Sequence, residues 1–181
     1  MKKKILMVVL FVAALTAVIL GATLGYKYLS KIYAPETNDA PTSLKTAADF
    51  TVLDGAGEQV TLSSKIGKPI VVNFWATWCG PCQSEMPAFD AMHRKYGDKV
   101  TFMMIDLTDG SRDTVESAAA FIKERGYGFP VYFDTTLSAA NSYGAYSIPL
   151  SVFINKNGEI VTTHTGAMDE ATLENYIKTI L

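Results

Sequence analysis

The segment PIVVNFWATWCGPC, residues 69–82, constrains the fold of this chain more than any other stretch. Its first half, Pro69–Trp75, is rich in β-branched and aromatic residues, as is typical of a strand buried on both faces. Its second half contains both cysteines of the chain, Cys79 and Cys82, separated by two residues. A disulfide between them would close a very short loop, and disulfide stabilisation grows with loop length. The spacing therefore favours a chemical role for the pair over a structural one.

Strand and helix patterns alternate through the rest of the chain. Two short apolar segments flank the turn sequence DGAG and predict a hairpin over residues 50–62. A helix is expected to begin near the cysteines and to end at Gly97. Strands that alternate with helices indicate an α/β fold, with a central mixed sheet and helices on both of its faces. The other expected elements are strands at 100–106, 131–133, 151–154 and 159–165, helices at 112–126 and 169–181, and a short helix between the strands at 131–133 and 151–154.

Helical periodicity also predicts which side chains face the core. In the helix over residues 112–126, Val115, Ala119 and Ile122 are expected to point inward. In the last helix, the residues expected on the inward face are Leu173, Tyr176, Ile177 and Ile180.

The N-terminal segment is expected to anchor the chain in a membrane. MKKK precedes 21 uncharged residues, Ile5–Gly25. A helix of that length is ~31 Å long, which matches the ~30 Å hydrocarbon layer of a bilayer. The positive-inside rule places Lys2–Lys4 on the cytoplasmic side, so the rest of the chain is expected to face outward. We therefore expect a cytoplasmic stub and transmembrane signal anchor at 1–25, a flexible tether at 26–45 and a folded domain at 46–181.

A cleavable signal peptide is the alternative for this segment. The apolar region of a signal peptide is usually about 7–15 residues long and is followed by a cleavage site of the A-x-A type. The run here is longer, and no clear site follows it. The stretch APETNDAPTSL, residues 34–44, has the Pro, Thr and Ser content of a tether. The expected location is thus the cell membrane, with the N-terminus inside and the domain on the extracytoplasmic side.

Composition is consistent with a folded domain and excludes one class of partner. Of the 181 residues, 49% are hydrophobic and 19% are charged, which is enough apolar material for a core. From Thr46 onward, 10 Lys and Arg residues stand against 16 Asp and Glu residues, a net charge of −6. No basic run interleaved with aromatic residues occurs there, so nucleic acid is not expected as a partner.

The position of the cysteines at the start of a helix predicts redox chemistry. Free N–H groups and the helix dipole stabilise a thiolate at a helix N-terminus, where Cys79 is expected. Cys82 lies one turn further along the helix and is shielded. Pro81 needs no N–H donor in a first turn, so Gly80 and Pro81 keep the bend short. The expected cycle is attack by Cys79 on a target disulfide, followed by attack of Cys82 on Cys79 and release of the reduced target.

Two other uses of the cysteines are less well supported by the sequence. A zinc site would need Cys79, Cys82, His93 and His164, but their spacing fits no usual zinc finger, and a second close ligand pair is missing. A purely structural C-x-x-C pair is the other alternative. The two histidines are expected to have structural roles, and no metal site is expected.

The segment VVNFWATWCGPC, Pro87 within the following helix and Ile148-Pro149 before a late strand together resemble the thioredoxin superfamily. The chain is most similar to the membrane-tethered, extracytoplasmic branch of that superfamily, the TlpA- and ResA-like thiol–disulfide oxidoreductases. The resemblance covers Asp49–Leu181, and its W-C-x-x-C segment is highly specific. It implies a thioredoxin-like fold with an additional N-terminal hairpin before the strand that leads to the cysteines.

The resemblance also implies roles for individual residues. Cys79 becomes the nucleophile and Cys82 the resolving thiol. Pro149 becomes a cis-proline that faces the pair, and the backbone of Ile148 becomes the edge along which the substrate chain pairs. Glu85 matches an active-site acid of ResA-like proteins. The residues implied to bind substrate are Trp78, Gly80, Pro81, Ile148 and Pro149.

Two residues depart from the pattern of the superfamily. Cytoplasmic thioredoxins have a buried Asp where this chain has Asn73. An amide cannot relay a proton, so that role would pass to Glu85 or to water. Many relatives have Thr after the cis-proline, where this chain has Leu150. These differences bear on the polarity around Cys82 and not on the fold.

The residues and the resemblance together predict an anchored enzyme that reduces protein disulfides outside the cytoplasm. No G-x-G-x-x-G motif for a dinucleotide is present, so no cofactor is expected, and electrons would come from a membrane-embedded thiol carrier. A thiol oxidase or disulfide isomerase on the same scaffold is the first alternative, because potentials in this class span about 150 mV. Gly80-Pro81, the dipeptide of reducing thioredoxins, favours reduction.

The expected partners are protein substrates that contain disulfides. Their identity stays open among the haem-site thiols of apocytochrome c, a spore or envelope protein, and partners in peroxide or methionine-sulfoxide repair. A non-enzymatic binding module that uses the fold as a scaffold is the alternative from a different functional class, and the presence of both cysteines argues against it.

Overall fold

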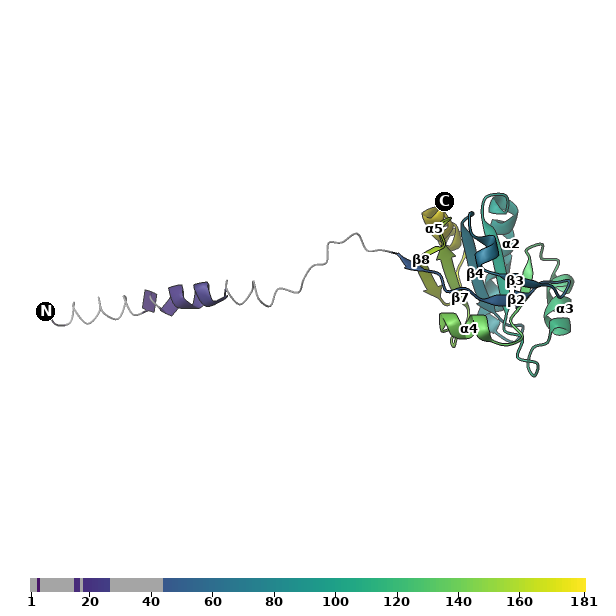
Figure 1. Ribbon diagram of the computed structural model, residues 1–181, viewed down its shortest axis with the longest axis horizontal. Helices are drawn as coiled ribbons and strands as arrows, with labels where there is room; N and C mark the ends of the chain where they lie inside the picture. Colours follow the sequence, from purple (N-terminus) through teal and green to yellow (C-terminus); the bar gives the residue numbers. More distant parts are fainter. Residues whose placement is uncertain (1–2, 4–14, 17, 27–43) are drawn as a thin grey trace. The chain divides into compact units, whose positions relative to one another are not determined.

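A computed structural model describes residues 3, 15–16, 18–26 and 44–181 of the chain (Figure 1). They belong to two units, Met1–Ser43 and Leu44–Leu181. In the first unit, residues 15–16 and 18–26 are helical. Within the described ranges, no helix has the length and apolar character needed to cross a membrane. Much of the predicted anchor at 5–25 and nearly all of the predicted tether at 26–45 lie outside the described residues.

The second unit is built on one eight-stranded sheet, with the strand order β1-β8-β7-β4-β5-β6-β2-β3. β4, β5 and β6 are parallel to one another, and the other neighbouring pairs are antiparallel, which confirms the predicted mixed sheet. The strands are β1 (Lys45–Thr46), β2 (Thr51–Leu53), β3 (Gln59–Thr61), β4 (Ile70–Trp75), β5 (Thr101–Asp106), β6 (Val131–Phe133), β7 (Leu150–Ile154) and β8 (Glu159–Thr165).

Helices link the parallel strands and cover the sheet (Figure 1). α2 connects β4 to β5, α3 connects β5 to β6, α4 precedes β7, and α5 ends the chain. Each strand and helix expected from the sequence is present, with small differences at the ends. The helices are η1 (Ser63–Lys65), α2 (Gly80–Tyr96), α3 (Val115–Arg125), α4 (Ser138–Tyr143) and α5 (Glu170–Ile180).

β4 is the central strand that positions the cysteines. All six of its residues are buried, as its continuous apolar sequence predicts. It pairs with β5 on one side and with β7 on the other. The carboxyl end of β4 therefore lies in the middle of the sheet edge, and the short connection after Trp75 leads directly into α2.

The sheet separates two apolar clusters because successive strand residues point to opposite faces. Val71 and Trp75 of β4 pack with α2, α3 and α5. Val72 and Phe74 pack on the other face with α4 and with residues around the β2–β3 hairpin. Asn73 is on the same face as Val71 and Trp75, so its side chain enters the layer between the sheet and α2.

Two details of the expected structure are corrected. Ala119 is exposed, and Ala118 is buried in its place. The reason is that α3 also packs Phe121 against Trp75, at 5.8 Å between ring centroids, which turns the buried stripe of the helix toward Ala118. Lys45, expected at the end of the tether, lies in β1 and pairs with Ile160 of β8, so the sheet begins before the predicted domain boundary.

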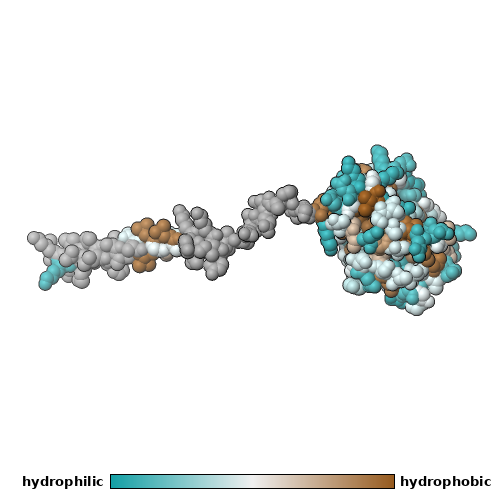
Figure 2. Space-filling view, in the orientation of Figure 1, coloured by the Kyte–Doolittle hydropathy of each residue, from teal (hydrophilic) through white to brown (hydrophobic). Residues whose placement is uncertain are grey.

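The two units differ in the surfaces that they present. The face of the second unit seen in Figure 2 is covered mainly by hydrophilic and neutral residues. In the first unit, the apolar side chains that the structure describes are more than half exposed: Leu15, Val18, Ile19, Leu20 and Leu24.

Candidate redox site

The cysteine pair lies at the junction of β4 and α2, where the sequence predicts it. Cys79 is the N-cap residue of α2, and its Sγ accepts a hydrogen bond from the Cys82 N–H at 3.2 Å. Pro81 occupies the first turn, where no helical partner exists for an N–H group. The two sulfurs form a disulfide, with an S–S distance of 2.06 Å and a Cα–Cα distance of 5.2 Å.

The two sulfurs differ in access. Cys79 is 5% exposed and Cys82 is fully buried. Trp78, Gly80 and Pro81, predicted to bind substrate, are exposed around Cys79. A thiolate at Cys79 would face free N–H groups of the first helical turn, which stabilise negative charge. Cys79 is thus placed to react with an external disulfide, and Cys82 is placed to react with Cys79 alone.

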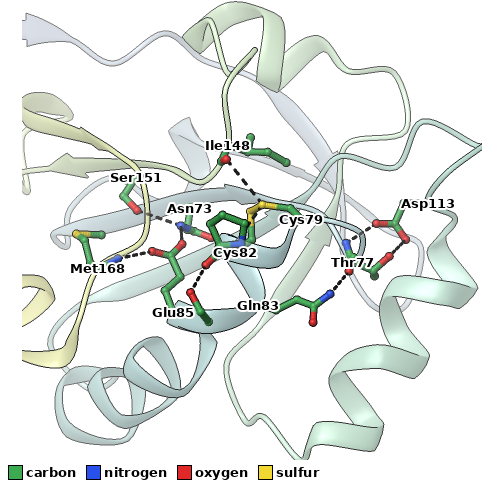
Figure 3. The surroundings of a disulfide bond; sticks show 12 residues. Asn73, Thr77, Cys79, Cys82, Gln83, Glu85, Asp113, Ile148, Ser151 and Met168 are labelled. Atoms are coloured by element: carbon green, nitrogen blue, oxygen red, sulfur yellow. Dashed lines mark hydrogen bonds between the residues drawn. A yellow bond between two sulfur atoms is a disulfide. The ribbon is translucent and has the colours of Figure 1, made fainter.

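The chain segment before β7 faces the pair, as the resemblance implies. The Ile148–Pro149 peptide bond is cis, which confirms that expectation. The Ile148 carbonyl oxygen lies 3.7 Å from Cys79 Sγ, although the two residues are 69 positions apart in the sequence. Ile148 is half-buried and Pro149 is buried. The backbone of this segment therefore forms one wall of the space in front of Cys79 (Figure 3).

Glu85 is buried on the inner face of α2, one turn beyond Cys82. Its side chain is 1% exposed. One carboxylate oxygen accepts a hydrogen bond from Asn73 Nδ2 at 2.9 Å, and the other accepts one from the Met168 N–H at 3.0 Å. Burial raises the pKa of the Glu85 carboxyl to about 7, although these two hydrogen bonds act in the opposite direction. Glu85 therefore exchanges a proton in the neutral pH range.

Asn73 and Ser151 complete this polar cluster. They are partners in the register of β4 and β7, and Asn73 Nδ2 also donates to Ser151 Oγ at 3.0 Å. Asn73 Oδ1 is buried and has no hydrogen-bond partner within the described structure. The resemblance implies only that Asn73 cannot relay a proton as the usual Asp does. In the structure Asn73 has a role of its own, because its amide donates to the Glu85 carboxylate and holds it against the sheet.

A second polar cluster lies on the other side of the disulfide (Figure 3). Asp113 accepts hydrogen bonds from the backbone N–H of Thr77 at 2.6 Å and from Thr77 Oγ1 at 2.8 Å. Arg112 lies over the Trp78 ring, with its guanidinium carbon 3.9 Å from the ring centroid. The sequence did not indicate these contacts, because Asp113 there resembles any acid at the start of a helix.

A groove of about 200 Å³ adjoins the exposed side of the pair. Its lining includes Trp78, Arg112, Tyr146 and Ile148. Tyr146 is 84% exposed. The groove therefore begins at the predicted substrate-binding residues and extends away from Cys79.

The two histidines lie in other surroundings. His93 packs edge-on against Phe102, and His164 contacts the hydroxyl of Tyr176. Across the described residues, no group of three or more His, Cys, Asp or Glu side chains is placed to hold a metal ion.

A disulfide at the N-terminus of a helix, a cis-proline segment facing it and a buried acid behind it define a thioredoxin-like thiol–disulfide oxidoreductase. The family comparison agrees with this class, since the AhpC/TSA family matches residues 44–163. The ResA thiol–disulfide oxidoreductase of Bacillus cereus is 31% identical over 181 residues, 99% of either chain. That of Halalkalibacterium halodurans is 30% identical over 162 residues, 90% of this chain and 89% of the relative.

A solved structure leads to the same group. StoA from Bacillus subtilis superposes with a TM-score of 0.62 at 28% identity, over 71% of this chain and 96% of StoA. The chain belongs to the AhpC/TSA family and, within it, to the ResA-like thiol–disulfide oxidoreductases.

Proposed function

We propose that this protein reduces disulfides of other proteins on the extracytoplasmic side of a membrane. The observation that carries the proposal is the asymmetry of the pair. Cys79 is an N-cap residue that reaches the surface beside the Ile148 carbonyl, whereas Cys82 is fully buried. One sulfur is thus available to a substrate, and the other is available only after the first has reacted.

The first step is attack of the Cys79 thiolate on one sulfur of the substrate disulfide. The bond between Cys79 and that sulfur forms as the substrate S–S bond breaks, and the other substrate sulfur leaves as a thiolate. The free N–H groups at the start of α2 favour the attacking anion. The backbone of Ile148 is positioned to pair with an extended substrate segment during this step.

The second step resolves the mixed disulfide. Cys82 transfers its proton to the Glu85 carboxylate, and the resulting thiolate attacks Cys79 Sγ. The remaining substrate sulfur leaves as a thiolate and takes up a proton. The substrate has then gained two electrons and two protons, and the Cys79–Cys82 disulfide is left. A membrane-embedded thiol carrier would return the pair to the dithiol state.

Gly80-Pro81 between the cysteines supports the reducing direction. We expect a potential near thioredoxin's value of about −270 mV, far from the oxidising extreme of about −120 mV. Equilibration of the pair with glutathione redox buffers measures this value. A pair that is fully reduced in a buffer near −180 mV would instead support an oxidase or isomerase on the same scaffold.

The first unit supports the proposed location. Its described apolar side chains are exposed from Leu15 to Leu24, within the uncharged run Ile5–Gly25 that follows three lysines. We propose that residues 5–25 anchor the chain with its N-terminus inside. Substrates would then be disulfide-containing proteins of the cell surface, and apocytochrome c is one candidate.

Trapping with Cys82→Ala tests the function directly. Without the resolving thiol, Cys79 should stay bound to its substrate, and mass spectrometry of the adduct identifies the partner. Cys79→Ala is the matched control and should yield no adduct. Recovery of the same proteins with both variants would contradict the proposed exchange mechanism.

A further inference from the structure

The groove beside the redox site is lined by residues from several separate parts of the chain. Trp78 precedes Cys79 directly, and the Ile148 carbonyl oxygen lies 3.7 Å from Cys79 Sγ. The groove that these two residues line also includes Arg112 from the loop between β5 and α3 and Leu137 from the start of α4. A substrate segment that reacts with Cys79 therefore lies next to this groove.

The size and lining of the groove suit a single side chain of a bound protein. Its volume of about 200 Å³ is below the ~300–1,000 Å³ of sites that bind small molecules and cofactors. Apart from Arg112 and Asn141, every residue of the lining is apolar or aromatic. Such a lining gains free energy when an apolar side chain displaces water from it.

Two exposed aromatic rings belong to the lining. Trp78 and Tyr146 are both exposed, and Tyr146 is the most exposed large apolar side chain described in the second unit. Tyrosine and tryptophan are enriched at interfaces, because each combines a large apolar surface with a polar tip. Their exposure side by side with the reactive cysteine indicates a surface that a partner covers.

Leu137 has an unusual backbone conformation. Its φ of 56° lies in the left-handed region, and among the described residues it is the one non-glycine residue with a positive φ. Its N–H donates to the Asp134 carbonyl oxygen at 3.1 Å, and its own carbonyl oxygen accepts from the Asn141 N–H at 3.0 Å. Glycine adopts this conformation without steric cost, and strained residues cluster at ligand-binding sites. The leucine side chain in the groove is therefore a candidate contact for a ligand.

Arg112 is the single charged residue of the lining. Its guanidinium carbon lies 3.9 Å from the centroid of the Trp78 ring, and its Nε donates to Asp109 Oδ2 at 3.1 Å. The Arg112 side chain is 63% exposed, and within the described structure its terminal nitrogens have no acceptor. A guanidinium group stacked on an aromatic ring can still bind a carboxylate through these nitrogens.

We propose that this groove selects substrates in which an apolar side chain and a carboxylate both lie close to the reactive cysteine. The apolar side chain enters between Trp78, Leu137 and Tyr146, and the carboxylate pairs with Arg112. These residues determine specificity and take no part in the exchange of sulfur bonds. The proposal rests on the proposed exchange function of Cys79 and adds the class of substrate.

Peptides that carry one cysteine as a mixed disulfide with thionitrobenzoate test this preference. The Cys79 thiolate of the reduced full chain attacks the peptide sulfur, so a Cys79–peptide disulfide forms and coloured thionitrobenzoate leaves. The peptides differ at one position at a time, within two residues of the cysteine, where they carry Phe, Ser, Glu or Lys. We expect one position at which Phe reacts about tenfold faster than Ser. At another position, Glu should react about fivefold faster than Lys.

Variants assign each preference to a residue. Arg112→Gln should abolish the preference for Glu over Lys and leave the preference for Phe. Arg125→Gln is the matched control, because Arg125 likewise covers an aromatic ring, that of Phe121 at 4.8 Å, outside the groove; it should keep both preferences. Leu137→Gly removes the side chain at a position where glycine is unstrained, and it should reduce the preference for Phe to about threefold or less.

Alkylation of Cys79 by iodoacetamide, an uncharged reagent, measures the reactivity of the thiol alone. We expect all variants to alkylate within about twofold of the unmodified protein. Equal rates for all peptides in the unmodified protein would overturn the proposal, and so would preferences that persist in both groove variants. These results would leave the exchange function standing, whereas a reduced protein that exchanges with none of the peptides would refute both.

Discussion

Replacement of Glu85 by Gln tests how the buried thiol is activated. At pH 7, a thiol with an ordinary pKa of about 8.5 is only ~3% thiolate. A base with a pKa of about 7, held one turn along the same helix, is half ionised at that pH and can take the proton. A positioned general base contributes about 10²–10⁴-fold to rate. We therefore expect Glu85→Gln to slow resolution of the mixed disulfide by about 100-fold at pH 7.

A rapid-mixing experiment separates the two steps. Excess Ellman's reagent reacts first with Cys79 and releases one coloured thiolate, and attack by Cys82 then releases a second. We expect Glu85→Gln to change the rate of the first phase by less than about twofold and to slow only the second phase. In the unmodified protein, the second phase should rise through about pH 7 and then level off. In the variant, it should keep rising about tenfold per pH unit, because thiolate formation then depends on solvent.

Glu124→Gln is the matched control, since it changes the same side chain at an exposed position on α3. It should reproduce the rates and the pH profile of the unmodified protein. Equal second-phase rates in Glu85→Gln and Glu124→Gln, with superimposable profiles, would refute the role of Glu85 as a proton acceptor. A slower first phase as well would show that the variant disturbs the whole site.

Four further outcomes are expected. The raised pKa of Glu85 means that the folded chain binds a proton more tightly than the unfolded one, so this stabilisation is complete below about pH 4.5 and is lost as the pH rises through about 7. This stabilisation amounts to about 3 kcal/mol. The free energy of unfolding in urea should therefore decline between pH 4 and pH 8.5, and Glu85→Gln should flatten that decline. Asn73→Asp places a second carboxyl group where an amide now donates at 2.9 Å, so the midpoint of the second-phase pH profile should move upward; an unchanged midpoint would contradict the contact. Leu173→Ala removes a fully buried side chain of α5 and should lower the free energy of unfolding by about 2–5 kcal/mol in urea, without changing the rate of Cys79 alkylation at pH 7. The native protein should begin at or near Met1 and stay with membranes after an alkaline wash, whereas an N-terminus beyond Gly25 in a soluble protein would refute the anchor.

Local sequence patterns predicted the order of the strands and helices along the chain and the place of the cysteines between them. These features depend on local patterns. The apolar run of β4 requires burial on both faces, and the change from strand to helix periodicity places Cys79 at a helix N-terminus. The cis peptide bond between Ile148 and Pro149 and the active-site role of Glu85 were predicted from the resemblance, because neither site has a local sequence pattern that reveals its role.

The surroundings of the cysteine pair depend on contacts between segments that are far apart in the sequence. Met168 donates to Glu85 across 83 positions, and Asn73 meets Ser151 across 78. Asp113 accepts a hydrogen bond from the Thr77 N–H across 36 positions. Ala118 is buried because Phe121 of the same helix packs on Trp75. Such contacts arise when strands and helices with their own local preferences are packed together. Burial at the first of these contacts, and not residue type, raises the pKa of the Glu85 carboxyl to about 7.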